Sequence, residues 1–149
     1  MYKKILIPTD GSIHSSNAAR HAIEIACQMK ADIIALSVID NHYLELTAQY
    51  SAINRLESSF VNNAKDNLEK VRGMLTEARI EGKCLEDIPI ITKIREGNPA
   101  GEILRISDEE GIDLIVMGRG GRKGVSRFLM GSTTSKVVRS APCPVLTVL

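Results

Sequence analysis

Five short apolar runs are spaced along the chain, and each suits a strand that is buried on both faces. They cover residues 5–7, 33–39, 88–94, 112–117 and 145–149. Isoleucine, leucine and valine dominate them, and none alternates strictly between apolar and polar residues. Such strands are typical of parallel sheets, which helices cover on both sides. This pattern constrains the fold more than any other feature of the sequence.

Segments with helical periodicity separate the apolar runs. Ser15, Ser16 and Asn17 can cap a first helix, and Pro99 stands where a later one would begin. Residues 40–54 have no clean period, and we interpret them as a loop with some helix. Helices are therefore predicted from this cap to about residue 30, over residues 56–80 and 99–110, and from Ser132 to about Ser140.

Strand and helix alternate throughout, which predicts right-handed βαβ units and a parallel sheet. We expect residues 1–149 to form one doubly wound, Rossmann-like α/β domain. Its sheet should have five parallel strands, with helices on both faces. Ligands of such sheets bind beyond the carboxyl ends of the strands. The loops 8–12, 38–42 and 117–131 follow such ends, so the topology alone predicts a site there.

Charge and composition exclude several classes of protein. The formal net charge is only +1, whereas proteins that bind nucleic acid usually carry a large basic excess. No run approaches the roughly 20 apolar residues that span a bilayer. The apolar run after Lys3 and Lys4 is too short for a signal peptide. We therefore expect a cytoplasmic protein without nucleic acid or membrane as partner.

The three cysteines give no disulfide signal. Their number is odd, no two are close in sequence, and no CxxC occurs. Cys27 lies on the apolar face of a predicted helix, Cys84 in a polar loop, and Cys143 between two prolines. We expect a reduced cytosolic protein in which these thiols act as small hydrophobic side chains.

A glycine pattern follows the fourth apolar run. Gly118 and Gly121 come directly after that run, and Gly131 opens the last predicted helix. Glycines let a backbone approach an anion closely, and the helix N-terminus then supplies N–H groups and a positive dipole. This arrangement predicts a phosphate site. It matches neither the P-loop nor the dinucleotide fingerprint, so ordinary turn glycines and a plain helix cap remain the alternative.

Four segments in a fixed order extend this pattern. They are I-L-I-P-T-D-G-S from Ile5, S-V-I-D from Ser37, G-x2-G-x9-G-[ST] from Gly118 and P-C-P-V-L-T-V-L from Pro142. Together they resemble the universal stress protein family, over the whole length from Lys3 to Leu149. The complete glycine pattern is similar to that of the ATP-binding branch of the family.

The resemblance implies an adenine nucleotide site at the loops named above. Asp10 would approach the ribose or a metal on the phosphates, and Val38 would contact adenine through its backbone. The resemblance further implies that Pro8 and Thr9 form the floor of the pocket, and that Met117 and Gly118 line its ribose and base side.

The phosphates would lie at the glycine loop. The resemblance implies that Gly121 lets the loop wrap them. Four cations stand in this loop, Arg119, Arg122, Lys123 and Arg127, and they either neutralise polyphosphate or are merely solvated. Arg119 and Arg127 are the favoured contacts. The resemblance also implies that Gly131, Ser132 and Thr133 bind the phosphates with backbone N–H and hydroxyl groups.

A carboxylate beside polyphosphate requires a sugar hydroxyl or a cation between them, because direct contact would be repulsive. We therefore predict Mg²⁺ or Mn²⁺ on the phosphates, with Asp10 as its protein ligand. The alternative for Asp10 is an Asx-turn or helix cap. His14 either reaches a phosphate or is a solvated loop residue. No Cys/His spacing suggests zinc.

The segment from Val145 to Leu149 should be an edge strand, because it ends the sequence. An apolar, uncharged edge invites pairing with another chain. The resemblance likewise implies a homodimer joined along this strand. Coverage of the edge by the protein's own helix is the alternative.

These observations favour a cytoplasmic ATP-binding stress-response or regulatory protein. Bound nucleotide would act as a conformational signal in the loop 119–130, read by a downstream protein partner. No catalytic motif is recognisable, so at most weak ATP hydrolysis is expected. The alternatives are a slow ATPase or autophosphorylating protein, an AMP or adenylate sensor, and a module without nucleotide. In the autophosphorylating case the phosphoryl acceptor would be Ser132, Thr133 or Thr134.

Overall fold

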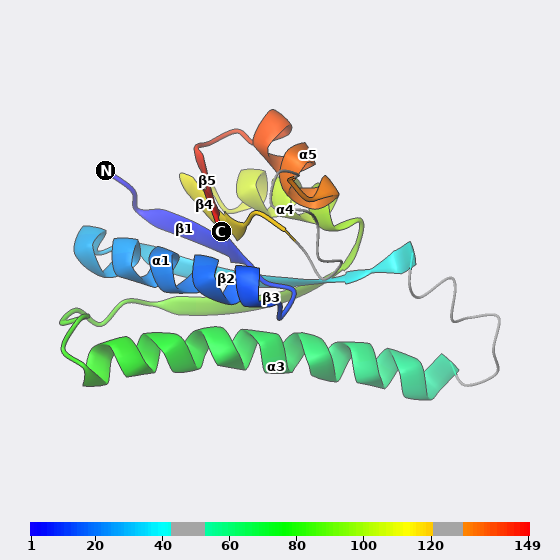
Figure 1. Cartoon of the computed structure of the whole chain (residues 1–149), viewed down its shortest axis with the longest axis horizontal. Helices are drawn as coiled ribbons and strands as arrows, with labels where there is room; N and C mark the ends of the chain where they lie inside the picture. Colours follow the sequence, from blue (N-terminus) through cyan, green and yellow to red (C-terminus); the bar gives the residue numbers. More distant parts are fainter. Residues whose placement is uncertain (43–52, 121–129) are drawn as a thin grey trace.

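Strands and helices alternate along the chain, as Figure 1 shows for the computed structural model. The structure describes residues 1–42, 53–120 and 130–149, with side chains in the long helix described from residue 58. The elements are β1 (Lys4–Pro8), α1 (Ile13–Met29), β2 (Asp32–Asp40), α3 (Ile53–Ile80), β3 (Ile90–Gly97), α4 (Pro99–Glu109), β4 (Leu114–Gly118), α5 (Ser132–Ser140) and β5 (Val145–Val148).

The strands form one parallel sheet in the order β3-β2-β1-β4-β5. Ile5 at the centre pairs with Ile33 of β2 on one side and with Leu114 of β4 on the other. Helices cover both faces, as Figure 1 shows. The predicted five-stranded parallel α/β fold is therefore confirmed, and β5 is an edge strand as expected.

Side chains of β1 alternate between two cores. Ile5 and Ile7 pack with the alanine-rich face of α1 and with Leu68, Val71 and Leu75 of α3. Leu6 packs on the other face with residues of α4 and with Val137 of α5. Since both faces are filled, the continuous apolar runs are explained by burial on both sides of the sheet.

Several predicted boundaries are wrong: β4 begins at Leu114 and not at Ile112, and α3 begins at Ile53 and not at Leu56. Two further ones have identifiable reasons. The cap of α1 is Ser12 and not Ser15–Asn17, because the Ser12 hydroxyl oxygen already accepts the Ser15 N–H at 3.2 Å. Strand β3 begins at Ile90 and not at Ile88. Pro89 has no N–H to give to the ladder, although its carbonyl accepts the Ile33 N–H at 2.9 Å.

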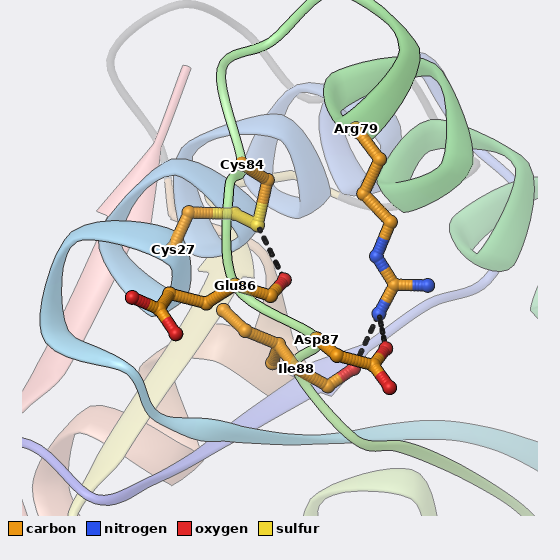
Figure 2. Close-up of a disulfide and its surroundings, with 6 residues drawn as sticks. All are labelled: Cys27, Arg79, Cys84, Glu86, Asp87 and Ile88. Carbon is orange, nitrogen blue, oxygen red and sulfur yellow. Dashed lines mark hydrogen bonds and ion pairs between the residues drawn. A yellow bond between two sulfur atoms is a disulfide. The ribbon is translucent and has the colours of Figure 1, made fainter.

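Cys27 and Cys84 form a disulfide, shown in Figure 2. The expectation of three reduced thiols is therefore wrong. Cys84 lies in the loop between α3 and β3, as predicted, but it is only 4% exposed and belongs to the core beside α1 and α3. The two cysteines are separated by 57 positions, and packing of α1 and α3 on one sheet face brings their Cα atoms to 5.1 Å. No local spacing in the sequence could reveal this contact.

Thiol counting tests the disulfide. Cys143 is the free cysteine, and its partial burial raises the pKa of its thiol, which slows alkylation at neutral pH. Intact-mass analysis should therefore show at most one slow iodoacetamide addition per chain without reductant. After reduction and denaturation it should show one addition at each of the three cysteines. Full alkylation of unreduced protein would contradict the disulfide.

Candidate functional site

The topological switch point of the sheet, where the connections move to opposite faces, lies between β1 and β4. From β1 the chain continues into α1, which packs on one face, and from β4 it reaches α5, which packs on the other. Ligands of doubly wound sheets bind at the carboxyl ends of the strands beside such a point. The loops after β1 and β4 are the two segments in which the predicted site residues concentrate.

The loop after β1 is fixed by short polar contacts. The Thr9 N–H donates to the Leu36 carbonyl at 2.8 Å, and its buried hydroxyl lies 3.3 Å from the Ser15 hydroxyl. One carboxylate oxygen of Asp10 accepts the Ser12 N–H at 3.0 Å. This is the Asx-turn that the sequence left open as an alternative for Asp10, and it holds the carboxylate at the start of α1.

Val38 stands where the end of β2 projects past β1. The last residue pair of these strands is Pro8 with Leu36, two positions before Val38. On the other side Val38 still pairs with Arg95 of β3. Its main chain on the β1 side therefore lies beyond the end of β1, where a planar base can pair with it as a strand would.

Gly118 ends β4 against the first turn of α1. A Cβ at this position would lie 2.7 Å from the His14 carbonyl carbon, so only glycine permits the approach. The His14 ring lies near Gly120, and its Nδ1 is buried without a hydrogen-bond partner among the described residues. His14 is thus the second residue of α1 and packs on the glycine loop, which contradicts a solvated loop position. Met117 is 5% exposed, so its side chain belongs to the core and only its backbone faces the edge.

The N-terminus of α5 lies beside the end of β4. Gly131 is its N-cap and donates its N–H to the Arg119 carbonyl at 2.9 Å. The Thr134 hydroxyl donates to the Gly118 carbonyl at 2.9 Å. Among the described residues no side chain caps this helix, whereas Ser12 caps α1. No capping side chain in the described ranges therefore uses the first-turn N–H groups, which include those of Ser132 and Thr133, and such groups can bind an anion.

The structure thus brings the predicted residues of the β1, β2 and β4 ends to one edge of the sheet. Gly121 and Arg127, together with Arg122 and Lys123, fall outside the described residues. Within the described ranges, no group of three or more His, Cys, Asp or Glu side chains could hold a metal ion. The role of Asp10 as a ligand of Mg²⁺ or Mn²⁺ therefore stays a prediction.

The described helices include none long and apolar enough to cross a membrane.

A polar hollow beside Asp10 was missed by the sequence analysis. Its volume is about 510 Å³, and one wall is a face of α3. The signal was Asn67, a polar residue on the helix face that buries Ala64, Leu68 and Val71. Polar side chains at core positions of a helix usually have a hydrogen-bond partner or a ligand. The hollow is lined by Asp10, Gly11, Ser12, Asn63, Asp66, Asn67 and Lys70.

Fold and site together define a parallel α/β domain with an uncapped helix N-terminus at its topological switch point. A match to the universal stress protein family covers residues 1–148, and the chain belongs to this family. Universal stress protein MJ0531 of Methanocaldococcus jannaschii is 38% identical over 149 residues, which cover 99% of this chain and 82% of that protein.

Solved structures of other proteins have the same fold. The solved structure of hypothetical protein MJ0577 is similar to this one, with a TM-score of 0.82. The two sequences are 30% identical, and the match covers 99% of this chain and 96% of that one. A universal stress protein from Archaeoglobus fulgidus, solved in complex with dAMP, has the same fold, with a TM-score of 0.70 and 20% identity. Here the match covers 99% of this chain and 98% of the other.

Proposed function

We propose that the protein is an ATP-binding regulatory protein of the stress response, in which bound nucleotide is a conformational signal. The uncapped α5 N-terminus at the end of β4 carries this proposal. A helix N-terminus without a side-chain cap, beside a glycine that permits close backbone approach, suits a phosphate group. The dAMP complex of a protein with the same fold supports an adenylate as ligand.

The sheet order suggests how the nucleotide lies. Strand β1 stands between β2, which carries Val38, and β4, which ends at Gly118. With its base at Val38 and its phosphates at Gly131–Thr133, a nucleotide crosses the end of β1. Its middle part, the ribose, then passes over Asp10. Arg119, Gly121 and Arg127 would add to the phosphate end, and Mg²⁺ or Mn²⁺ would bridge the phosphates and Asp10.

Thr134 is disfavoured as a phosphoryl acceptor. Thr134, one of the three possible acceptors, is 3% exposed and its hydroxyl is engaged with the Gly118 carbonyl. We therefore propose a signal read by a protein partner, with the loop between β4 and α5 as the responsive segment. The cytoplasm remains the proposed location. The Cys27–Cys84 disulfide argues against this location unless the organism is a hyperthermophile, because disulfides are otherwise rare in reducing compartments.

A homodimer through β5 is part of the proposal. This strand lies at an edge of the sheet, and it contains only valine, leucine and threonine. At the opposite edge, Lys93 and Arg95 of β3 pair with Glu110 and Glu109 of the α4 region. Charged residues discourage strand pairing, so the β5 edge is the better surface for a second copy.

The nucleotide proposal is tested with the purified wild-type protein. Denaturation and chromatography identify any co-purified nucleotide. Calorimetric titration of nucleotide-free protein then compares ATP, AMP and GTP with and without Mg²⁺. We expect ATP to bind most tightly, and only with Mg²⁺ present. Equal affinities for ATP and AMP would favour the adenylate-sensor alternative, and absence of any bound adenylate would refute the proposal.

A further inference from the structure

The Cys27–Cys84 disulfide lies at the end of the domain opposite the candidate site. Cys27 is in the last turn of α1, and Cys84 follows α3 in the loop before β3. Because α1 begins after β1 and ends before the parallel strand β2, its last turn lies at the amino edge of the sheet. The disulfide and the candidate site are therefore at the two ends of one helix, about 25 Å apart along its 17 residues.

The first turn of α1 touches the glycine loop. A Cβ on Gly118 would lie 2.7 Å from the His14 carbonyl carbon, and one on Gly120 would lie 3.7 Å from the His14 ring. The helix backbone thus packs directly on the residue that ends β4. A small displacement of α1 along its axis would therefore change the shape of this loop.

The buried face of α1 resists such a displacement only weakly. Five of its six buried residues are alanine or serine, and the full set is Ser15, Ala18, Ala19, Ala22, Ile23 and Ala26. Small side chains interlock less with the sheet than branched ones do, and sliding of packed helices over short distances is a common protein motion. The attachments at its ends therefore contribute much to the axial position of α1.

The disulfide is the firm attachment at the far end of α1. The loop that carries Cys84 is itself anchored, since Arg79 donates to the Ile88 carbonyl at 2.8 Å. The Lys30–Glu86 ion pair also joins the end of α1 to this loop, but its side chains are 69% and 48% exposed. Exposed ion pairs hold their partners weakly. Reduction of the disulfide would therefore loosen α1 at this end.

The surroundings of Cys84 accommodate reduction. Its Sγ lies 3.7 Å from the Glu86 carbonyl oxygen, which can accept a hydrogen bond from the S–H group of the reduced form (Figure 2). Cys27 is partly buried and Cys84 is only 4% exposed, so an external thiolate reaches the Cys27 sulfur more readily.

The exchange reaction needs a dithiol as reductant. Attack of one of its thiolates on the Cys27 sulfur expels the Cys84 thiolate and forms a mixed disulfide. The second thiolate of the dithiol then attacks its own sulfur in that mixed disulfide and expels the Cys27 thiolate. Two electrons pass to the protein, each cysteine takes up one proton, and the dithiol leaves as its own disulfide.

We propose that this disulfide is a redox switch for the nucleotide site, and that α1 connects the two. The inference rests on the proposed function. In the oxidised protein the bond holds α1 in the position that shapes the loop at Gly118. In the reduced protein, nucleotide binding must also order the helix, which lowers the affinity. A redox-sensing role agrees with the proposed location, because cytosolic disulfides are usually transient, catalytic or redox-sensing.

Calorimetric titration with ATP and Mg²⁺ tests the switch, using oxidised and dithiothreitol-reduced wild-type protein. We expect the oxidised protein to bind ATP about tenfold more tightly. Cys27→Ala/Cys84→Ala should bind ATP as the reduced wild type does, with or without dithiothreitol. Cys143→Ala is the matched control, because Cys143 is the free cysteine and packs on the other face of the sheet. It should keep the tenfold difference.

The reduction potential of the disulfide is the reciprocal measurement, because coupling between two sites acts equally in both directions. In dithiothreitol redox buffers, saturating ATP should lower this potential by about 30 mV, which corresponds to a tenfold affinity ratio for a two-electron couple. Equal ATP affinities in the two redox states would overturn the switch and leave nucleotide binding intact. A disulfide that dithiothreitol reduces only after unfolding would also overturn it. Failure of both forms to bind any adenylate would refute the proposed function, and the switch with it.

Discussion

Ser132→Asp is expected to weaken ATP binding about a hundredfold while making the protein more stable. Ser132 is exposed in the first turn of α5, whose N-terminus is capped by no side chain of the part of the chain that the structure describes. A carboxylate there interacts favourably with the helix dipole, which stabilises the fold by about 0.3–1 kcal/mol. The same charge repels phosphates and occupies the N–H groups that would bind them. The loss of affinity corresponds to about 2.7 kcal/mol.

Misfolding would lower both the stability and the affinity for ATP, whereas this variant should gain stability and lose affinity. Thermal unfolding reports the stability, and calorimetry reports the affinity for ATP. Ser132→Asn is the neutral control of nearly the same shape, and it should bind ATP within about threefold of the wild type, a difference below 1 kcal/mol. If Ser132→Asp binds ATP as the wild type does, the phosphates do not lie at the N-terminus of α5.

The five parallel strands could be predicted because burial on both faces leaves a clear trace in the sequence, whereas their order in the sheet was not predicted. The run of residues 33–39 is apolar apart from Ser37, and the structure pairs that strand with neighbours on both sides. The ends of helices and strands were harder to predict from the sequence, because single hydrogen bonds decide them. Ser12 and Ser15 are both good capping residues, and only the fold determines which one begins α1.

Candidate site residues could be predicted where they follow strand ends, but not where a distant helix contributes. Thr9, Asp10, Val38 and Gly118 come from local motifs, and the parallel sheet brings their strand ends to one edge. Asn67 reaches this edge only because α3 packs beside α1. Its contact with Gly11 depends on tertiary packing, for which a single sequence carries no periodic signal.

Removal of the Cys27–Cys84 disulfide is the second large effect that we expect. The bond joins the last turn of α1 to the segment between α3 and β3, across 57 positions of sequence. Closing a loop of that length in the unfolded chain corresponds to about 4 kcal/mol of stabilisation in the chain-entropy treatment. Domains are commonly stable by only about 5–15 kcal/mol, so this is a large fraction of the total.

The fold itself should survive the loss of the bond, because other contacts hold the same segment. Arg79 of α3 donates to the Ile88 carbonyl at 2.8 Å and to the Asp87 carboxylate at 2.9 Å, as Figure 2 shows. Glu86 pairs with Lys30 just after α1, at 2.7 Å. The two ion pairs are exposed and individually weak, and the hydrogen bond to Ile88 is partly buried, so together they preserve the arrangement without replacing the stabilisation.

Cys27→Ala/Cys84→Ala should therefore remain folded, with a thermal midpoint about 10 °C lower than that of the oxidised wild type. The wild type heated with a reductant should shift by a similar amount, because the same constraint is removed. Reductant should leave the midpoint of the double variant unchanged, and Cys143→Ala should respond to reductant as the wild type does. A double variant as stable as the oxidised wild type would show that the disulfide contributes nothing to folding. In that case the packing of α1 against α3 would hold this end of the domain by itself.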